Sequence, residues 1–181
     1  YVQKQLDTKV RRVKVETIAT ASLSELISII KNAKFHKDWV FFNKTACILE
    51  EESDYSWKYY AHTDSPWPVF DRDFITDVVL IQDSIDYSVK IISVALPDFI
   101  PENEECVRIR TIFSQWTFNP LGNGSVYIKL EIAADIGGKI PIWLFNLAVA
   151  KGPQSTMEGL LNELQKEKNK NVTLDYVKEL Q

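Results

Sequence analysis

The segment whose residue types are best suited to chemistry is DSPWPVFDRDFITDVVL, from Asp64 to Leu80. It places Asp71, Arg72 and Asp73 at the start of a run of Phe, Ile and Val that is typical of a β-strand. Side chains alternate across a strand, so Arg72 is expected on the apolar face and the two aspartates on the other. A buried guanidinium needs acceptors. Arg72 is therefore either half of a structural ion pair or a polar anchor for a ligand.

Other chemistry has little support in the residue types. Asp71 and Asp73 could act as paired acid and base, but solvated positions or backbone caps at the start of the strand are the simpler prediction. The chain has two histidines and two cysteines and no CxxC or CxxH spacing. It therefore predicts no metal site, no catalytic Cys-His pair and no disulfide framework, and it predicts two buried free thiols, Cys47 and Cys106. We expect no cofactor.

Composition and charge narrow the class of protein further. A length of 181 residues with 45% hydrophobic and 25% charged residues fits one globular domain. The net charge of −4 argues against nucleic acid as a partner. Residues 1–168 are predicted to form the domain, and residues 169–181 a tail that is either a short helix or frayed. The chain does not begin with Met, so an upstream part is expected to be missing, and cytoplasmic, periplasmic and secreted locations all stay open.

Hydrophobic periodicity predicts the elements that must position these residues. Ser22 and Glu25 form an S-x-x-E capping box before a short helix within residues 21–32. A long helix is predicted from Pro141 to about Lys168, kinked at residues 151–153. Strands are predicted at residues 10–20, 45–51, 55–63, 70–82, 87–96, 105–113, 115–118 and 125–134.

The order of these elements predicts an α+β fold. Short turns between successive strands indicate an antiparallel meander, and one face of that sheet must be covered. The long C-terminal helix is the element long enough to cover it. We therefore expect a curved sheet that grips this helix and encloses a hydrophobic cavity where the two surfaces diverge. A filled core is the alternative.

Four segments in order resemble the START family, the steroidogenic-acute-regulatory-protein-related lipid-transfer domains. They are WPVFDRDF (67–74), VRIR (107–110), SQWTFNPLGNGS (114–125) and ADIGGKIPIWLFNLAVAKGP (134–153). The resemblance covers about residues 10–164, and Ser114 stands where the family commonly has glycine. It implies the helix-grip fold, a hydrophobic tunnel for one lipid or apolar molecule and no catalysis, in a bacterial-type stand-alone member. It also implies that Arg72 matches an arginine that meets an anionic headgroup in some members.

Strand alternation and the long helix predict which side chains face the cavity. Taken one at a time, each of them fits ordinary core better than a ligand contact. The candidates are Trp57, Tyr59, Arg72, Phe74, Thr76, Ile91, Ser93, Ile109, Ile128, Trp143, Phe145 and Leu147.

The sequence thus predicts a soluble, non-enzymatic protein that binds, and in one version transfers, a lipid or another hydrophobic small molecule. Transient membrane contact through the apolar segment 140–150 fits this function, and that segment is too short to span a bilayer. One alternative is a helix-grip cyclase or hydrolase that acts on a polyketide- or steroid-like substrate with Tyr59, Arg72 and Asp73 as its polar groups. Another is a protein-interaction module that uses the loop 67–70.

Overall fold

The computed structural model describes residues 2–3, 11–135 and 141–180. Its strands are β1 (Val2–Gln3), β2 (Arg11–Thr20), β3 (Asn43–Ser53), β4 (Ser56–Thr63), β5 (Asp71–Gln82), β6 (Val89–Ala95), β7 (Cys106–Arg108), β8 (Thr111–Pro120) and β9 (Ser125–Asp135). Its helices are α1 (Leu23–Lys31), the 3-10 helix η1 (Ala33–Asp38), α2 (Ile142–Leu164) and the 3-10 helix η2 (Glu167–Asn169). None of the helices in the described residues is long and apolar enough to cross a membrane.

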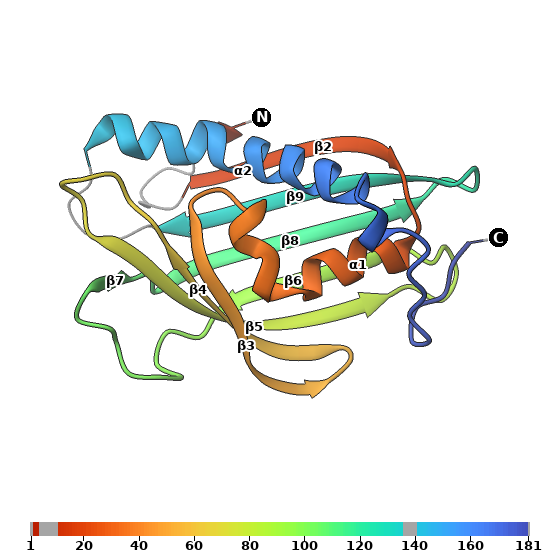
Figure 1. Cartoon of the computed structure of the whole chain (residues 1–181), viewed down its shortest axis with the longest axis horizontal. Helices are drawn as coiled ribbons and strands as arrows, with labels where there is room; N and C mark the ends of the chain where they lie inside the picture. Colours follow the sequence, from red (N-terminus) through yellow and green to blue (C-terminus); the bar gives the residue numbers. More distant parts are fainter. Residues whose placement is uncertain (1, 4–10, 136–140, 181) are drawn as a thin grey trace.

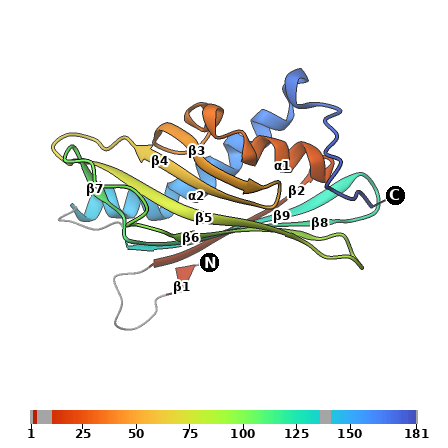
Figure 2. The same ribbon diagram turned by 90° about the horizontal axis from the view of Figure 1, so that it is seen from below.

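The strands form one curved sheet in the order β1-β2-β9-β8-β6-β5-β4-β3. All neighbours along this path are antiparallel. The helices α1, η1 and α2 lie on one side of the sheet (Figures 1 and 2). This arrangement confirms the expected curved antiparallel sheet with a long C-terminal helix.

One predicted strand was wrong. The run expected as a single strand at residues 105–113 is divided into β7, which pairs in parallel with β5, and β8, which begins at Thr111. The backbone N–H of Ile109 donates to the carbonyl of Asp73, and the Arg108 side chain also binds Asp73. These bonds hold β7 against β5 and shift the alternation of inward and outward side chains in β8.

Helix α1 begins at the predicted capping box. The Ser22 hydroxyl accepts from the backbone N–H of Glu25, and the Glu25 carboxylate accepts from the backbone N–H of Ser22. Glu179 adds a second cap, because its carboxylate accepts from the backbone N–H groups of Leu23 and Ser24 at 2.9 and 2.8 Å. A carboxylate at a helix N-terminus also offsets the positive end of the helix dipole.

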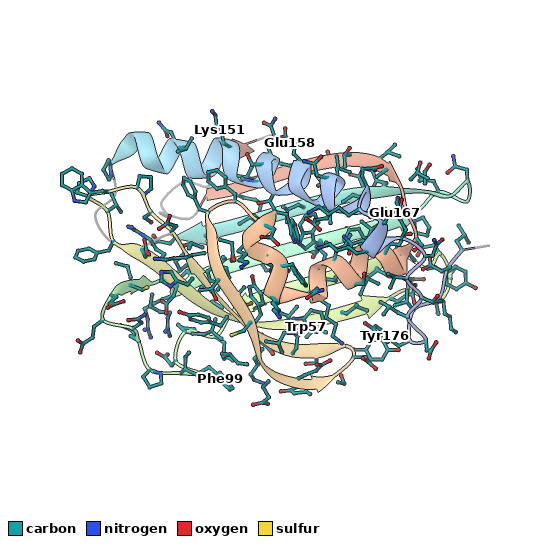
Figure 3. The ribbon with its side chains drawn as sticks, viewed as in Figure 1. Trp57, Phe99, Lys151, Glu158, Glu167 and Tyr176 are labelled. Carbon is teal, nitrogen blue, oxygen red and sulfur yellow. The ribbon has the colours of Figure 1, made fainter. Side chains whose placement is uncertain are left out.

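The tail is docked rather than frayed, which corrects the expectation for residues 169–180. Beyond η2 it contains no further helix. The backbone of Lys178 exchanges two hydrogen bonds with the side chain of Gln82, and Val177 is buried in the main core. The hydroxyl of Tyr55 donates to the carbonyl of Tyr176, whose side chain is labelled in Figure 3. The tail therefore joins α1 to the β3–β4 and β5–β6 hairpins.

Close packing of α2 against the segment after η1 depends on Gly159. A Cβ at this position would lie 2.2 Å from the carbonyl oxygen of Trp39. Helix α2 continues through Pro153, and the neighbouring Gly152 packs against the ring of Phe41. These two glycines let α2 approach the segment that connects η1 to β3.

Gly159→Ala is expected to lower the free energy of unfolding by about 1–3 kcal/mol, because the backbone of Trp39 must move to make room. Alanine would otherwise favour the helix by about 1 kcal/mol. Gly152→Ala is the matched control, since its Cβ would meet only the movable ring of Phe41 at 3.3 Å. Urea unfolding of the two variants tests this, and a Gly159→Ala protein as stable as Gly152→Ala would contradict the packing described.

Candidate functional site

A cavity lies between the sheet and the helical layer. Its volume is about 160 Å³. Aromatic side chains from both layers line it, among them Trp39, Trp57 and Trp116. Figure 3 labels Trp57 on β4. It also labels Lys151 and Glu158, whose side chains extend from α2 away from the sheet. The expected hydrophobic cavity is therefore present and not completely filled by side chains.

Six of the twelve predicted site residues line this cavity. They come from three adjacent strands, β4, β5 and β6, on which the side chains alternate strictly between the two faces of the sheet. They are Trp57, Tyr59, Phe74, Thr76, Ile91 and Ser93.

Of the other six, four do not line it in the described structure, and two have side chains outside the described residues. Ile109 is buried beside β7, where the break before β8 changes which side chains face inward. Ile128 has the inward orientation but is fully buried in the filled core. Leu147 is half-buried on α2 away from the cavity lining. The side chains of Trp143 and Phe145 lie outside the described residues.

Arg72 is the sixth, and the sequence left it open whether it is half of a structural ion pair or an anchor for a ligand. Its side chain is buried and donates to the carbonyl of Phe70. Burial lowers the pKa of the Arg72 guanidinium. Arg72 is not among the cavity-lining residues.

The buried carboxylate Asp73 forms its ion pair with Arg108, on the opposite face of β5 from the cavity. Nε and Nη2 of Arg108 lie 2.8 and 2.9 Å from the two carboxylate oxygens of Asp73. The same guanidinium also donates to the carbonyls of Pro97, Ile100 and Pro101. The prediction that Asp73 is a solvated position was wrong, because β7 and the loop 96–105 cover it.

Asp71 fulfils the prediction of a backbone cap at the start of β5. Its Oδ1 accepts from the backbone N–H of Ser65, while Oδ2 lies 3.0 Å from Lys44 Nζ and 2.8 Å from His62 Nε2. Partial burial acts to raise the pKa of Asp71, but the hydrogen bonds from Lys44, His62 and Ser65 lower it to about 2. Asp71 is thus an ionised structural group.

The fold also brings together Cys106, His62 and Asp71, which spacing along the chain did not predict. The Cys106 sulfur lies 3.6 Å from His62 Nε2, and the Asp71 carboxylate contacts this same nitrogen. In a nucleophilic triad the nucleophile and the orienting acid contact different ring nitrogens of the histidine base. Burial, followed by the charges of Asp73 and Asp71, also raises the pKa of the Cys106 thiol. The cluster is therefore unsuited to nucleophilic catalysis.

The thiols themselves differ from the prediction of two buried cysteines. Cys47 is exposed on β3, because its position there points to solvent, and Cys106 is partly buried. No group of three His, Cys, Asp or Glu side chains in the described ranges could hold a metal ion.

The cavity has one polar corner that the sequence did not indicate. The Nε2–H of His36 donates to the carbonyl of Ile30 at 2.9 Å, and Nδ1 accepts from the hydroxyl of Tyr59 at 2.7 Å. Burial lowers the pKa of His36 to about 4 and raises the pKa of Tyr59 well above its usual range. Both groups are consequently uncharged at neutral pH. Tyr59 was predicted to face the cavity, but His36 was missed because η1 is neither a strand nor part of the long helix from which the candidates were drawn.

Comparisons with known proteins agree with this architecture, although no family model matches the chain. An uncharacterized protein of Pseudomonas aeruginosa is 26% identical over 166 residues, which cover 92% of this chain and 81% of that protein. The STAR-related lipid transfer protein of Xanthomonas axonopodis superposes with a TM-score of 0.83 at 25% identity, over 92% of each chain.

More distant structures share the same fold. The human StarD13 lipid transfer and protein localization domain has a TM-score of 0.74 at 17% identity, with 91% of this chain and 82% of that one covered. The Zhui aromatase/cyclase of Streptomyces sp. R1128 has a TM-score of 0.60 at 11% identity, with coverages of 85% and 93%. The resemblance carried by the four sequence segments is confirmed: the chain has the START helix-grip fold.

Proposed function

We propose that this protein binds a lipid or another hydrophobic small molecule in the cavity between its sheet and α2, without catalysing a reaction on it. The observation that carries the proposal is an unfilled cavity with a largely apolar lining inside a fold shared with lipid-transfer proteins. Burying apolar ligand surface there gains roughly 25 cal/mol per Å².

The size of the cavity limits what it holds without rearrangement. An apolar cavity of roughly 150 Å³ accommodates a molecule the size of benzene. The cavity of about 160 Å³ therefore suits one ring or a short hydrocarbon segment. A larger lipid requires the helical layer to move outward, as lids do during ligand entry.

The enzymatic alternative has weaker support, even though an aromatase/cyclase shares the fold. Of the three polar groups considered for it, Tyr59 donates to His36, Asp73 is paired with Arg108 on the other face of the sheet, and Arg72 is absent from the cavity lining. These groups do not converge on one point where a substrate could react.

Exposed apolar side chains support membrane contact as part of the proposed function. In the β4–β5 loop, the side chain of Trp67 is 91% exposed and that of Phe70 is 70% exposed. Tryptophan at such a position suits the boundary between water and lipid. We place transient membrane contact during ligand exchange at this loop.

A cavity-filling substitution tests the proposal. Ser93 lines the cavity from β6, whereas the next residue, Val94, is half-exposed on the outer face. Ser93→Phe is expected to place a ring in the void and to weaken binding of a hydrophobic molecule by at least about tenfold, because roughly 1.4 kcal/mol of lost binding energy is enough for that factor. Val94→Phe, the matched control, should bind as the wild type does.

Native mass spectrometry of the protein purified from its own host measures this directly. The expected result is a co-purifying hydrophobic mass on the wild type and on Val94→Phe, which is absent from a folded Ser93→Phe protein. Equal occupancy of all three proteins would place the ligand elsewhere and contradict the proposal.

A further inference from the structure

One buried hydroxyl in the cavity has no partner. The side chain of Thr76 is 1% exposed and lines the cavity from β5. Its Oγ1 forms no hydrogen bond with any group that the structure describes. Leaving a buried hydroxyl unsatisfied costs about 1–3 kcal/mol, so such atoms commonly mark a place where another molecule supplies the partner.

The strand register places three more hydroxyl groups beside or near Thr76, so that the four form a band across the sheet. Thr76 lies directly opposite Tyr59 of β4. On its other side, Ser93 of β6 pairs with Val78, which places Ser93 diagonal to Thr76, and Ser93 lies directly opposite Ser114 of β8. All four side chains line the cavity. They form the hydroxyl band, defined here as Tyr59, Thr76, Ser93 and Ser114.

Charge is missing from the surroundings of the hydroxyl band. No Asp, Glu, Lys or Arg is found among the described residues that line the cavity. Among the described residues that line the cavity, the titratable groups facing the band are Tyr59 itself and His36 from η1, whose ring contacts Tyr59. An ionised ligand group placed there would lose its hydration without gaining a counter-ion, which costs several kcal/mol.

We infer that the cavity selects a hydrophobic ligand with an uncharged oxygen function, a hydroxyl or carbonyl group, which hydrogen-bonds to Thr76 at the centre of the hydroxyl band. The inference rests on the proposed function and specifies its ligand chemistry. The hydroxyls of Thr76 and Ser93 can each donate and accept, whereas the proton of Tyr59 is donated to His36, so the band accommodates either kind of oxygen. A carboxylate or phosphate group is disfavoured at the same place.

Two probes of equal chain length, 1-octanol and octanoate, test the selectivity at pH 7 by NMR titration of the ¹⁵N-labelled protein. The wild type is expected to bind 1-octanol at least about tenfold more tightly than octanoate. Thr76→Val keeps the shape of the side chain and removes the hydroxyl. It should weaken 1-octanol binding by about 2–12-fold, the range that corresponds to one hydrogen bond, and leave octanoate binding unchanged.

Thermal unfolding of the ligand-free protein separates a ligand role from a structural one. Because Thr76→Val removes an unsatisfied buried group, its melting temperature should equal or exceed that of the wild type. A lower melting temperature would mean that the folded protein itself satisfies the hydroxyl, and would overturn the inference.

Different experimental results would contradict this inference and the proposed function. If 1-octanol and octanoate bind equally, or if Thr76→Val leaves 1-octanol binding unchanged, the hydroxyl band does not select the ligand, although the cavity still binds hydrophobic molecules. If neither probe binds and Ser93→Phe changes nothing, the proposed function fails together with the inference.

Discussion

Asp73→Ala is expected to lower the free energy of unfolding by about 3–5 kcal/mol, because it leaves the guanidinium of Arg108 buried without its counter-ion. The side chains of Arg108 and Asp73 are 2% and 1% exposed. The carbonyls of Ile100 and Pro101 accept from the same guanidinium but carry no full charge to balance it. The variant should also loosen the loop 96–105 and β7 from β5.

Urea unfolding measures this effect, and two variants serve as comparisons. Asp98→Ala removes one acid of the exposed pairs made by Arg110, where 0–1 kcal/mol is typical. The double variant Asp73→Ala with Arg108→Met removes both buried charges and should recover much of the loss. If Asp73→Ala costs no more than Asp98→Ala, the pair contributes little to the fold.

Acidification from pH 7 to about pH 4 is expected to remove about 3 kcal/mol of stability through His36 alone. Burial lowers the pKa of His36 in the folded protein to about 4, compared with 6.5 for the ordinary side chain. Below pH 6.5 the unfolded chain therefore binds a proton at His36, which the folded protein does not bind until the pH approaches 4. The contribution of His36 is fully present above pH 6.5 and is lost as the pH falls toward 4.

His36→Gln tests this assignment, since glutamine cannot take up the proton. Stability measured by urea unfolding should fall between pH 6.5 and pH 5 in the wild type and stay nearly constant in His36→Gln. His62→Gln changes the other histidine, outside the cavity, and serves as the comparison for the loss of an imidazole. Parallel slopes for the wild type and His36→Gln would assign the pH dependence to other groups.

Local patterns predicted most of the elements. The capping box of Ser22 and Glu25 set the start of α1, and alternation within β4, β5 and β6 identified six of the side chains that line the cavity. Both signals are local, because period and capping depend on neighbours within a few residues. The overall helix-grip fold followed from the order of the elements and the resemblance of the four segments.

Other features depend on contacts between distant segments, which periodicity does not report. The break between β7 and β8 follows from the contact of Arg108 and Ile109 with Asp73, and Ile109 is not among the residues that line the cavity. The tail is held by the Glu179 carboxylate, which caps α1, and by the hydrogen bonds between the Gln82 side chain and the tail backbone. The helical side of the cavity, including His36 and Thr156, becomes apparent only when the two layers are assembled.

The most direct test of the account asks where a hydrophobic molecule sits when it is bound. Isotope-filtered NMR on the methyl-labelled protein with unlabelled 1-octanol reports which methyl groups lie within a few ångströms of the probe. The account predicts contacts with Ile91, Leu130 and Ile132, which line the cavity, and none with the exposed Ile81 and Ile85. Contacts confined to the exposed methyl groups, with the cavity methyl groups unaffected, would contradict it.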